Sequence, residues 1–245
     1  MKKITFTLFF FTFLFYNNCQ SATLGEIRDD IRSQLKDNNP TETNRRWSDT
    51  LLNFRINQIQ TNISEETRCL IARISTHTIA NQREYDFPSD MIAPIRLAYY
   101  INASTPPAYK KLEFYIIGGL DNENANWENL SAGLPTKYYE FGDKYGLHPK
   151  PSAVYTSTYA VQIDYYQRAA DMTADSDIPF NGDVLLYPFH KLLILGVVIW
   201  CRGDQGMPSP DLETKYYALI GRMYEGVRKR IDNRGGIFSP SPFTR

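Results

Sequence analysis

The sequence predicts an α+β protein in which helices from both ends of the chain form a bundle and an antiparallel β lobe is inserted between them. Apolar residues recur every three or four positions over residues 24–35, 52–63 and 212–231, which is the period of an amphipathic helix, and residues 192–201 are almost continuously apolar. Between these segments, apolar and polar residues alternate with the period of two that is typical of strands. Because the helical segments flank the strands, we expect them to pack together.

Composition narrows the class of protein. The chain has 245 residues, of which 42% are hydrophobic, and this is enough for a sizeable core. Its 27 basic and 27 acidic residues give a formal charge of zero, which argues against a globally basic nucleic-acid-binding protein. Cys19, Cys69 and Cys201 are too few and too scattered for a disulfide scaffold or a zinc site.

Residues 1–22 resemble a leader segment. Two lysines precede an apolar run over residues 4–16, and small residues follow, which is the layout of a secretory signal. The run is shorter than the roughly 20 residues that cross a bilayer, and Gln20 weakens the cleavage site. Three interpretations stay open: a signal peptide, upstream sequence from a misassigned start, and an apolar arm of the folded protein. Under the first two, the domain begins at Thr23.

Residues 23–66 predict a helical hairpin. Thr23 and Glu26 form a capping box at the start of the first helix, and Pro40 follows its end. Ser48 is placed to cap a second helix, with Trp47 immediately before it. The predicted buried stripe of that helix is Leu52, Ile56, Ile59 and Ile63.

Residues 67–183 predict an antiparallel β lobe of five to six short strands. The alternation is clearest over residues 95–101 and 161–166, where aromatic and β-branched residues are frequent. Residues 111–117 fit a strand or a helix, residues 121–131 are predicted to be a polar loop, and Gly118 and Gly119 are read as a turn.

Residues 184–234 predict two more helices, which complete the bundle. Pro188 suits a first helical turn, and the apolar run from Leu192 to Cys201 predicts a helix buried on most sides. Ten apolar residues are too few to span a membrane, so we expect no membrane association. Ser209 and Pro210 begin the last helix. Its predicted buried stripe is Leu212, Tyr216, Leu219, Met223, Val227 and Ile231.

The sequence contains few residues in patterns that suit metal binding or catalysis. His77, His148 and His190 each lack a second histidine or cysteine at ligand spacing, so we expect no metal. No catalytic or phosphate-binding motif is present, and no cofactor is expected. A glycosidase-like carboxylate pair among the β-lobe aspartates is one alternative, but turns and solvated strand faces explain them more simply. These aspartates are Asp86, Asp90 and Asp164.

Charge is unevenly distributed at the carboxyl end of the chain. Lys215 and the residues after it include seven basic and two acidic side chains, a net charge of +5. Cations near a helix C-terminus stabilise the helix dipole, but five net charges exceed that need. Beyond the helix, prolines separate Ile237, Phe238 and Phe243, which favours an extended arm over residues 235–245. We expect this arm to dock on another polypeptide; a frayed tail is the alternative.

Taken in order, several short motifs resemble those of the head-to-tail adaptor (connector) proteins of tailed bacteriophages, especially the short-tailed type. Each motif is weak turn punctuation, but the ordered set and the helix–sheet–helix layout are more specific, and they cover residues 23–231. The motifs are Thr23-Leu24-Gly25-Glu26-Ile27, Trp47-Ser48-Asp49, Tyr85-Asp86-Phe87-Pro88-Ser89-Asp90, Gly133-Leu134-Pro135-Thr136-Lys137-Tyr138, Leu147-His148-Pro149-Lys150-Pro151 and Asp164-Tyr165-Tyr166.

The resemblance implies a structural virion protein and not an enzyme. Such adaptors form a ring, commonly of about twelve copies, that lies beneath the portal and extends the DNA channel toward the tail. The implied partners are the portal protein, a tail nozzle or tail-tube protein, further copies of the chain, and double-stranded DNA passing without sequence recognition. The implied location is the virion neck, assembled in the host cytoplasm. The portal-binding residues would be Arg228, Lys229, Arg230, Arg234, Phe238 and Phe243.

Two other functions stay open at this stage. If residues 1–22 are a working signal, the chain is an exported bacterial protein whose aromatic β lobe binds a surface glycan or peptide. The third hypothesis is a hydrolase that uses Asp86 or Asp164.

Overall fold

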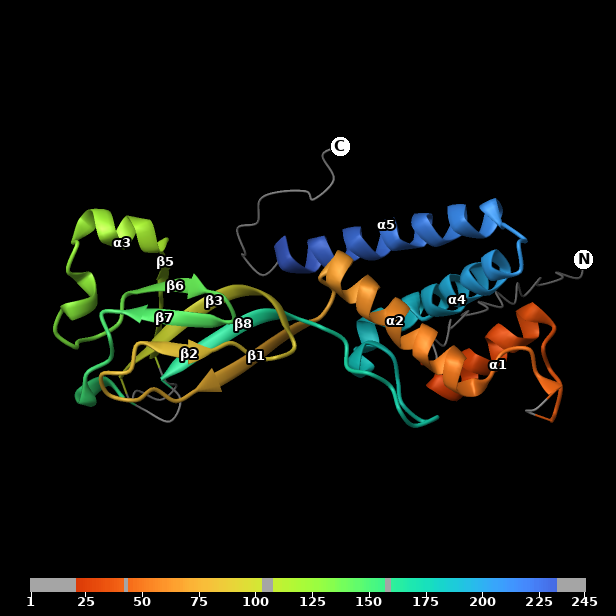
Figure 1. The fold of residues 1–245 in the computed structure, drawn as a ribbon, viewed down its shortest axis with the longest axis horizontal. Helices are drawn as coiled ribbons and strands as arrows, with labels where there is room; N and C mark the ends of the chain where they lie inside the picture. Colours follow the sequence, from red (N-terminus) through yellow and green to blue (C-terminus); the bar gives the residue numbers. More distant parts are fainter. Residues whose placement is uncertain (1–20, 42–43, 103–107, 157–159, 233–245) are drawn as a thin grey trace, which may run out of the picture.

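The computed structural model describes residues 21–41, 44–102, 108–156 and 160–232. The molecule is elongated, with a helical bundle at one end and a β lobe at the other, so the predicted α+β class is confirmed (Figure 1). Helices from both ends of the chain build the bundle. They are α1 (Leu24–Leu35), α2 (Asp49–Thr67), α4 (Lys191–Asp204) and α5 (Pro210–Asp232).

The β lobe consists of two four-stranded sheets. The first has the order β1-β8-β3-β4 and the second β2-β7-β6-β5. Every strand pair is antiparallel except β5–β6. The strands are β1 (Ile71–Thr76), β2 (Glu84–Asp86), β3 (Met91–Asn102), β4 (Ala108–Lys111), β5 (Glu113–Phe114), β6 (Lys137–Phe141), β7 (Lys144–His148) and β8 (Val161–Gln167).

The sequence prediction was wrong on two points within the lobe. It gave five to six strands, whereas the described residues form eight, because the short strands β4 and β5 carry little alternation. The expected polar loop and glycine turn include helix α3 (Ile117–Glu123) and a 3₁₀ turn at Trp127–Asn129. Trp127 explains the difference, since its buried ring packs against Tyr139 and its Nε1 donates to Asp121 Oδ1 at 2.8 Å.

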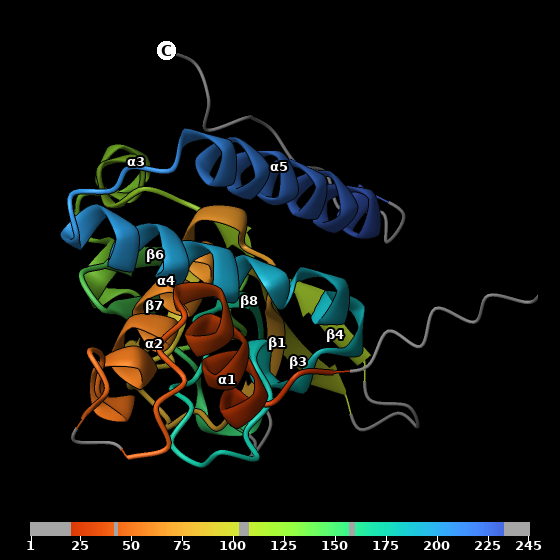
Figure 2. The ribbon, with the colours of Figure 1, turned by 90° about the vertical axis from the view of Figure 1, so that its right-hand side faces the viewer.

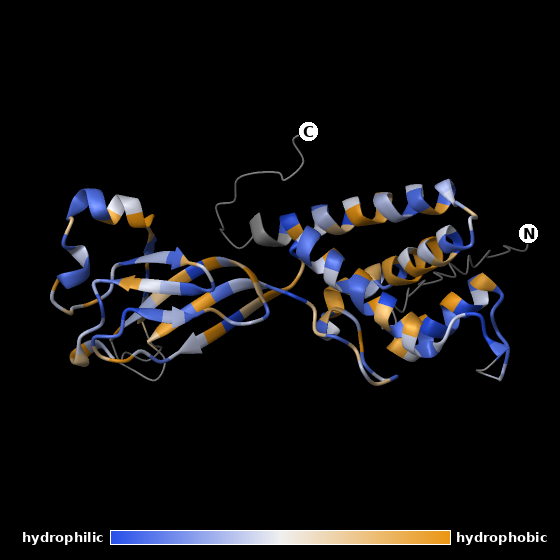
Figure 3. Ribbon diagram, in the orientation of Figure 1, coloured by the Kyte–Doolittle hydropathy of each residue, from blue (hydrophilic) through white to orange (hydrophobic). Residues whose placement is uncertain are grey.

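The bundle is organised around α4. Seven of its residues are buried, and six of them join a core with the inner faces of α1, α2 and α5. Figure 3 shows α4 as a nearly continuous hydrophobic helix between these neighbours. The stretch Val184–Asp204 is long and apolar enough to cross a membrane by composition alone, but here its larger part is α4, the core helix of the bundle. Pro188 lies in the preceding 3₁₀ segment, Val184–Phe189, and not in α4 itself.

One glycine allows three helices to meet. A Cβ at Gly196 of α4 would lie 2.9 Å from Ile59 Cδ1 of α2 and 3.3 Å from Tyr216 Cε2 of α5. Only a residue without a side chain permits so close an approach. The burial of Tyr216 at this crossing raises the pKa of its hydroxyl to about 12.

Ion pairs fix α1 to the start of α2. Both helices have the N-caps that the sequence predicts, Thr23 with its capping box and Ser48. The buried guanidinium of Arg32 pairs with Asp37 at 3.1 Å and with Asp49, which Arg28 contacts at 3.4 Å. A buried arginine requires such partners, because an unpaired buried charge is strongly destabilising.

The motifs that carry the resemblance are joined in pairs within the lobe. Asp90 accepts hydrogen bonds from the Tyr165 hydroxyl at 3.1 Å and from Gln167 Nε2 at 2.6 Å. The Gly133 N–H donates to the Lys150 carbonyl at 2.9 Å, and the Ser152 N–H donates to the Gly133 carbonyl at 3.1 Å. Each of the four motifs in the lobe is therefore in contact with one other motif.

Polar side chains on one face of α2 connect the bundle to the segment after β8. Gln60 is fully buried; its Nε2 donates to the Ala170 carbonyl and its Oε1 accepts from the Phe180 N–H, both at 2.8 Å. Asn57 exchanges two hydrogen bonds with the backbone of Met172, at 2.9 and 3.0 Å. These bonds satisfy backbone groups of residues 170–180 where that segment enters the core.

We predict that Gln60→Ala lowers the free energy of unfolding by about 2–5 kcal/mol, because each of two backbone groups left without a partner costs roughly 1–3 kcal/mol. Urea unfolding measures the change. Asn62→Ala, an exposed position on the same helix, is the control and should change the stability by less than about 0.5 kcal/mol. Equal effects of the two substitutions would contradict the role of Gln60.

Asp49 should contribute a pH-dependent part of the stability. Burial raises the pKa of Asp49, but the hydrogen bond from Arg32 and the charges of Arg28, Arg32 and Arg45 outweigh burial and lower it. The stabilising effect is therefore complete above the unfolded pKa of about 4 and is lost as the pH falls through the folded-state pKa.

We expect Asp49→Asn to lower the unfolding free energy at pH 7 by about 1–3 kcal/mol. The gap from the wild type should narrow as the pH falls below about 4. Urea titrations from pH 7 to pH 3 test this, with Asp30→Asn on the exposed face of α1 as the control. A gap that stays constant over this range would refute the assignment.

Candidate interaction surface

Helix α5 is the outermost layer of the bundle (Figure 2). The N–H groups of Leu212 and Glu213 donate to the Ser209 carbonyl, so the helix begins at Pro210 as the sequence predicts. Its 23 residues extend about 35 Å. Met223 and Val227 are buried in the bundle core, as the sequence predicts. Ile220 is buried there too, although the predicted stripe omitted it. The side chain of Ile231 lies outside the described residues.

The outer face of α5 is exposed over its whole described length. Lys215, Arg222 and Lys229 lie along one edge of this face, and Tyr217, which is 67% exposed, lies at its other edge. Sequence reasoning missed Tyr217, because a search for the buried stripe of a helix ignores its opposite face. Tyrosine and arginine are enriched among the residues that dominate protein interfaces.

The predicted portal-binding residues are only partly described. Arg228 and Lys229 lie in the last turns of α5 and are exposed. Arg230 belongs to the helix, but its side chain lies outside the described residues. Arg234, Phe238 and Phe243 also lie outside them, so their role stays a prediction.

The three aspartates of the β lobe have different surroundings. Asp164 in β8 lies between two arginines on neighbouring strands, Arg73 Nε at 2.5 Å and Arg96 Nε at 3.0 Å. Asp86 is exposed and pairs with Lys144 at 3.4 Å on the other sheet. Asp90 accepts the hydrogen bonds from β8 described above. Each carboxylate therefore has a structural partner.

The three histidines lie apart from one another in different surroundings. Burial lowers the pKa of His190 to about 4, while its Nδ1 accepts the Ala22 N–H at 3.2 Å. Burial, with the nearby charges of Arg83 and Lys137, lowers the pKa of His148, which stacks edge-on against Trp127. His77 is exposed after β1. In the described ranges, no three histidine, cysteine or acidic side chains gather as a metal ligand set.

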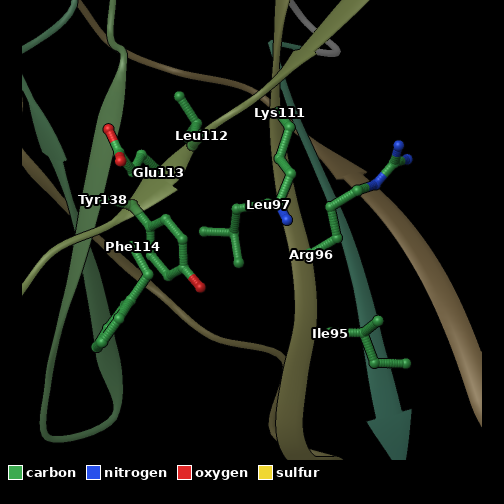
Figure 4. A pocket seen from close by; sticks show the side chains of 8 residues that line it. All are labelled: Ile95, Arg96, Leu97, Lys111, Leu112, Glu113, Phe114 and Tyr138. Atoms are coloured by element: carbon green, nitrogen blue, oxygen red, sulfur yellow. The ribbon is translucent and has the colours of Figure 1, made fainter. Parts of the chain in front are cut away.

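A pocket of about 340 Å³ opens where the chain crosses from one sheet to the other between β4 and β5. Figure 4 shows the Tyr138 ring beside Leu97, with Arg96 extending away from both. Burial and the charge of Glu140 raise the pKa of Tyr138 to about 12, so its hydroxyl keeps its proton at neutral pH. Arg96 is already paired with Asp164. Lys111 and Glu113 are the other ionisable side chains that line the pocket.

The exposed outer face of α5 is therefore the candidate interaction surface of the described residues. The family model described as SU10 adaptor protein matches residues 22–238. The match spans the bundle and the β lobe, so the chain belongs to this family, and the predicted resemblance to phage adaptors is confirmed. The protein is a bacteriophage adaptor and a structural component of the virion. A comparison with curated proteins found no match.

We predict that the double substitution Asp86→Asn and Asp164→Asn lowers the stability of the protein by about 1–2 kcal/mol while phage production continues. The loss follows from the missing ion pairs with Arg73 and Arg96. Complementation of an adaptor-deficient phage with the variant gene measures function, and urea unfolding measures stability. A folded variant that gives no infectious particles would support the hydrolase hypothesis.

Proposed function

We propose that the protein forms a ring beneath the portal of a short-tailed phage, extends the DNA channel and joins the portal to the tail nozzle or tail tube. The match to the adaptor family over residues 22–238 carries this proposal. The resemblance to phage adaptors implies a ring of about twelve copies. In such a ring each subunit presents two different faces related by a fixed rotation. Assembly would take place in the host cytoplasm, and the ring would lie in the virion neck.

The basic end of α5 supports a contact with the portal. Arg228 and Lys229 are exposed there, and the following sequence adds Arg234, Phe238 and Phe243. Charged groups at such a site steer association, and aromatic side chains supply most of the binding energy. We infer that the last turns of α5 and residues 235–245 bind the portal protein.

Exposed apolar side chains on the β lobe support a contact with the tail. Phe114, Ile116 and Phe141 are each at least half exposed, and they lie in or beside the strands of one sheet. The lobe occupies one end of the long axis of the molecule (Figure 1). The formal charge of zero fits a channel that double-stranded DNA passes without sequence recognition.

We predict that a chain ending at Gly235 binds the portal protein at least about a hundredfold more weakly, since each aromatic anchor is typically worth about 2 kcal/mol or more. The thermal melt of the truncated chain should change little, because the described bundle core ends at Val227. Surface plasmon resonance on immobilised portal measures the affinity.

The matched control for this truncation is Phe141→Ala, which removes an exposed phenylalanine from β6. Its affinity for the portal should equal that of the wild type. A truncated chain with wild-type affinity would exclude the docking-arm hypothesis.

A further inference from the structure

Helices α1 and α5 lie on opposite sides of the bundle. Figures 1 and 2 both show α5 as one outer layer and α1 on the far side of α4, and α4 contacts both helices. Each helix turns its apolar stripe toward α4 and leaves its other face exposed. The bundle therefore presents two different helical faces pointing in different directions.

One edge of the exposed face of α5 is mainly basic. Lys215, Arg222 and Lys229 are spaced by seven residues, close to two helical turns, and so lie along one line, with the exposed carboxylates of Asp211 and Glu225 on the same side of the helix. Within the described ranges, no ion pair involves any of the three. Their charges are available to a partner.

The exposed face of α1 is acidic. Glu26, Asp29 and Asp30 are exposed on it, whereas Arg28 and Arg32 turn inward to the ion pairs with Asp49 and its neighbours. In the described part of the chain, Asp29 and Asp30 take part in no ion pair. The exposed face of α1 is therefore acidic because the two arginines of this helix point inward.

A glycine in the middle of α5 has no role inside the subunit. A Cβ at Gly221 would find no atom within 4 Å, and this position is exposed next to Arg222. Glycine destabilises a helix interior relative to alanine, and no packing in the chain compensates here. Gly221 and Ala218, one turn earlier, leave room on this face for the close approach of another helix backbone.

We propose that the exposed face of α5 in one subunit packs against the exposed face of α1 in the next copy of the chain. Lys215 and Arg222 lie opposite Asp29 and Asp30, and the neighbouring helix approaches the backbone at Gly221. Two copies of the same face would bring like charges together, so the contact joins different faces and runs head to tail. A head-to-tail contact closes into a ring when the rotation between neighbouring subunits is a whole fraction of a turn. This inference rests on the proposed ring function and names the surfaces that build it.

A charge swap tests the pairing in the full-length chain. Lys215→Glu with Arg222→Glu, and separately Asp29→Lys with Asp30→Lys, should each weaken self-association about tenfold or more. The variant that combines all four substitutions should recover most of the association. Sedimentation velocity and negative-stain electron microscopy, with and without portal protein, measure the rings. Lys110→Glu with Lys111→Glu on exposed β4 is the control and should leave assembly unchanged.

Gly221→Gln separates assembly from folding. The substitution should raise the thermal melting temperature by about 2–4 °C, because a good helix former replaces glycine. It should nevertheless weaken ring formation about tenfold or more, because the side chain occupies the space of the neighbouring helix. Gly203→Gln in the last turn of α4, where a Cβ also meets nothing within 4 Å, should leave ring formation unchanged.

Three outcomes of these experiments separate the proposed α5–α1 interface from the proposed ring function. Wild-type protein that forms no annular particles, alone or with portal, would overturn both this inference and the proposed function. Wild-type rings that persist in the charge-reversed variants and in Gly221→Gln would overturn the interface and leave the ring function standing. Rings that both single reversals abolish and the combined variant fails to restore would overturn the pairing of α5 with α1.

Discussion

The arrangement of the molecule depends on a few polar side chains of α2 that hold the backbone after β8. Gln60 and Asn57 supply hydrogen-bond partners to Ala170, Met172 and Phe180 where this segment enters the bundle. Buried backbone groups without partners are strongly unfavourable, so the segment follows this path only because α2 satisfies it. Its path brings the chain from the lobe to the start of α4, the core helix.

The position of α4 in turn determines which surfaces reach a partner. Gly196 lets α2 and α5 approach it closely, so α5 lies as an outer layer with one face buried and the other exposed. The ion pairs of Arg28 and Arg32 with Asp49 draw basic side chains inward and leave acidic residues outside on α1. The contacts that stabilise the bundle thus also determine which charged side chains are exposed to the partners of the adaptor.

The short motifs that indicate the family also have a physical basis. Each is a turn signal of little specificity alone, but the folded lobe joins them, as Asp90 with Tyr165 and Gly133 with Lys150 show. A change in one motif would leave a polar group of another without its partner. This mutual dependence explains why an ordered set of weak motifs identified the adaptor family more reliably than any one of them.

The sequence alone determined the helices, their caps at Thr23 and Ser48, the strand β8 and the α+β layout, because periodicity and capping act within one or two turns. It also predicts an interaction site at the basic carboxyl end, and this stays a prediction; Arg228 and Lys229 are its described residues. Only the tertiary structure decided the helix at Ile117–Glu123, the partners of Gln60 and Asp164, and the opposite placement of the acidic and basic faces. Those features join residues far apart in the chain, and no local pattern records which distant group a side chain will meet.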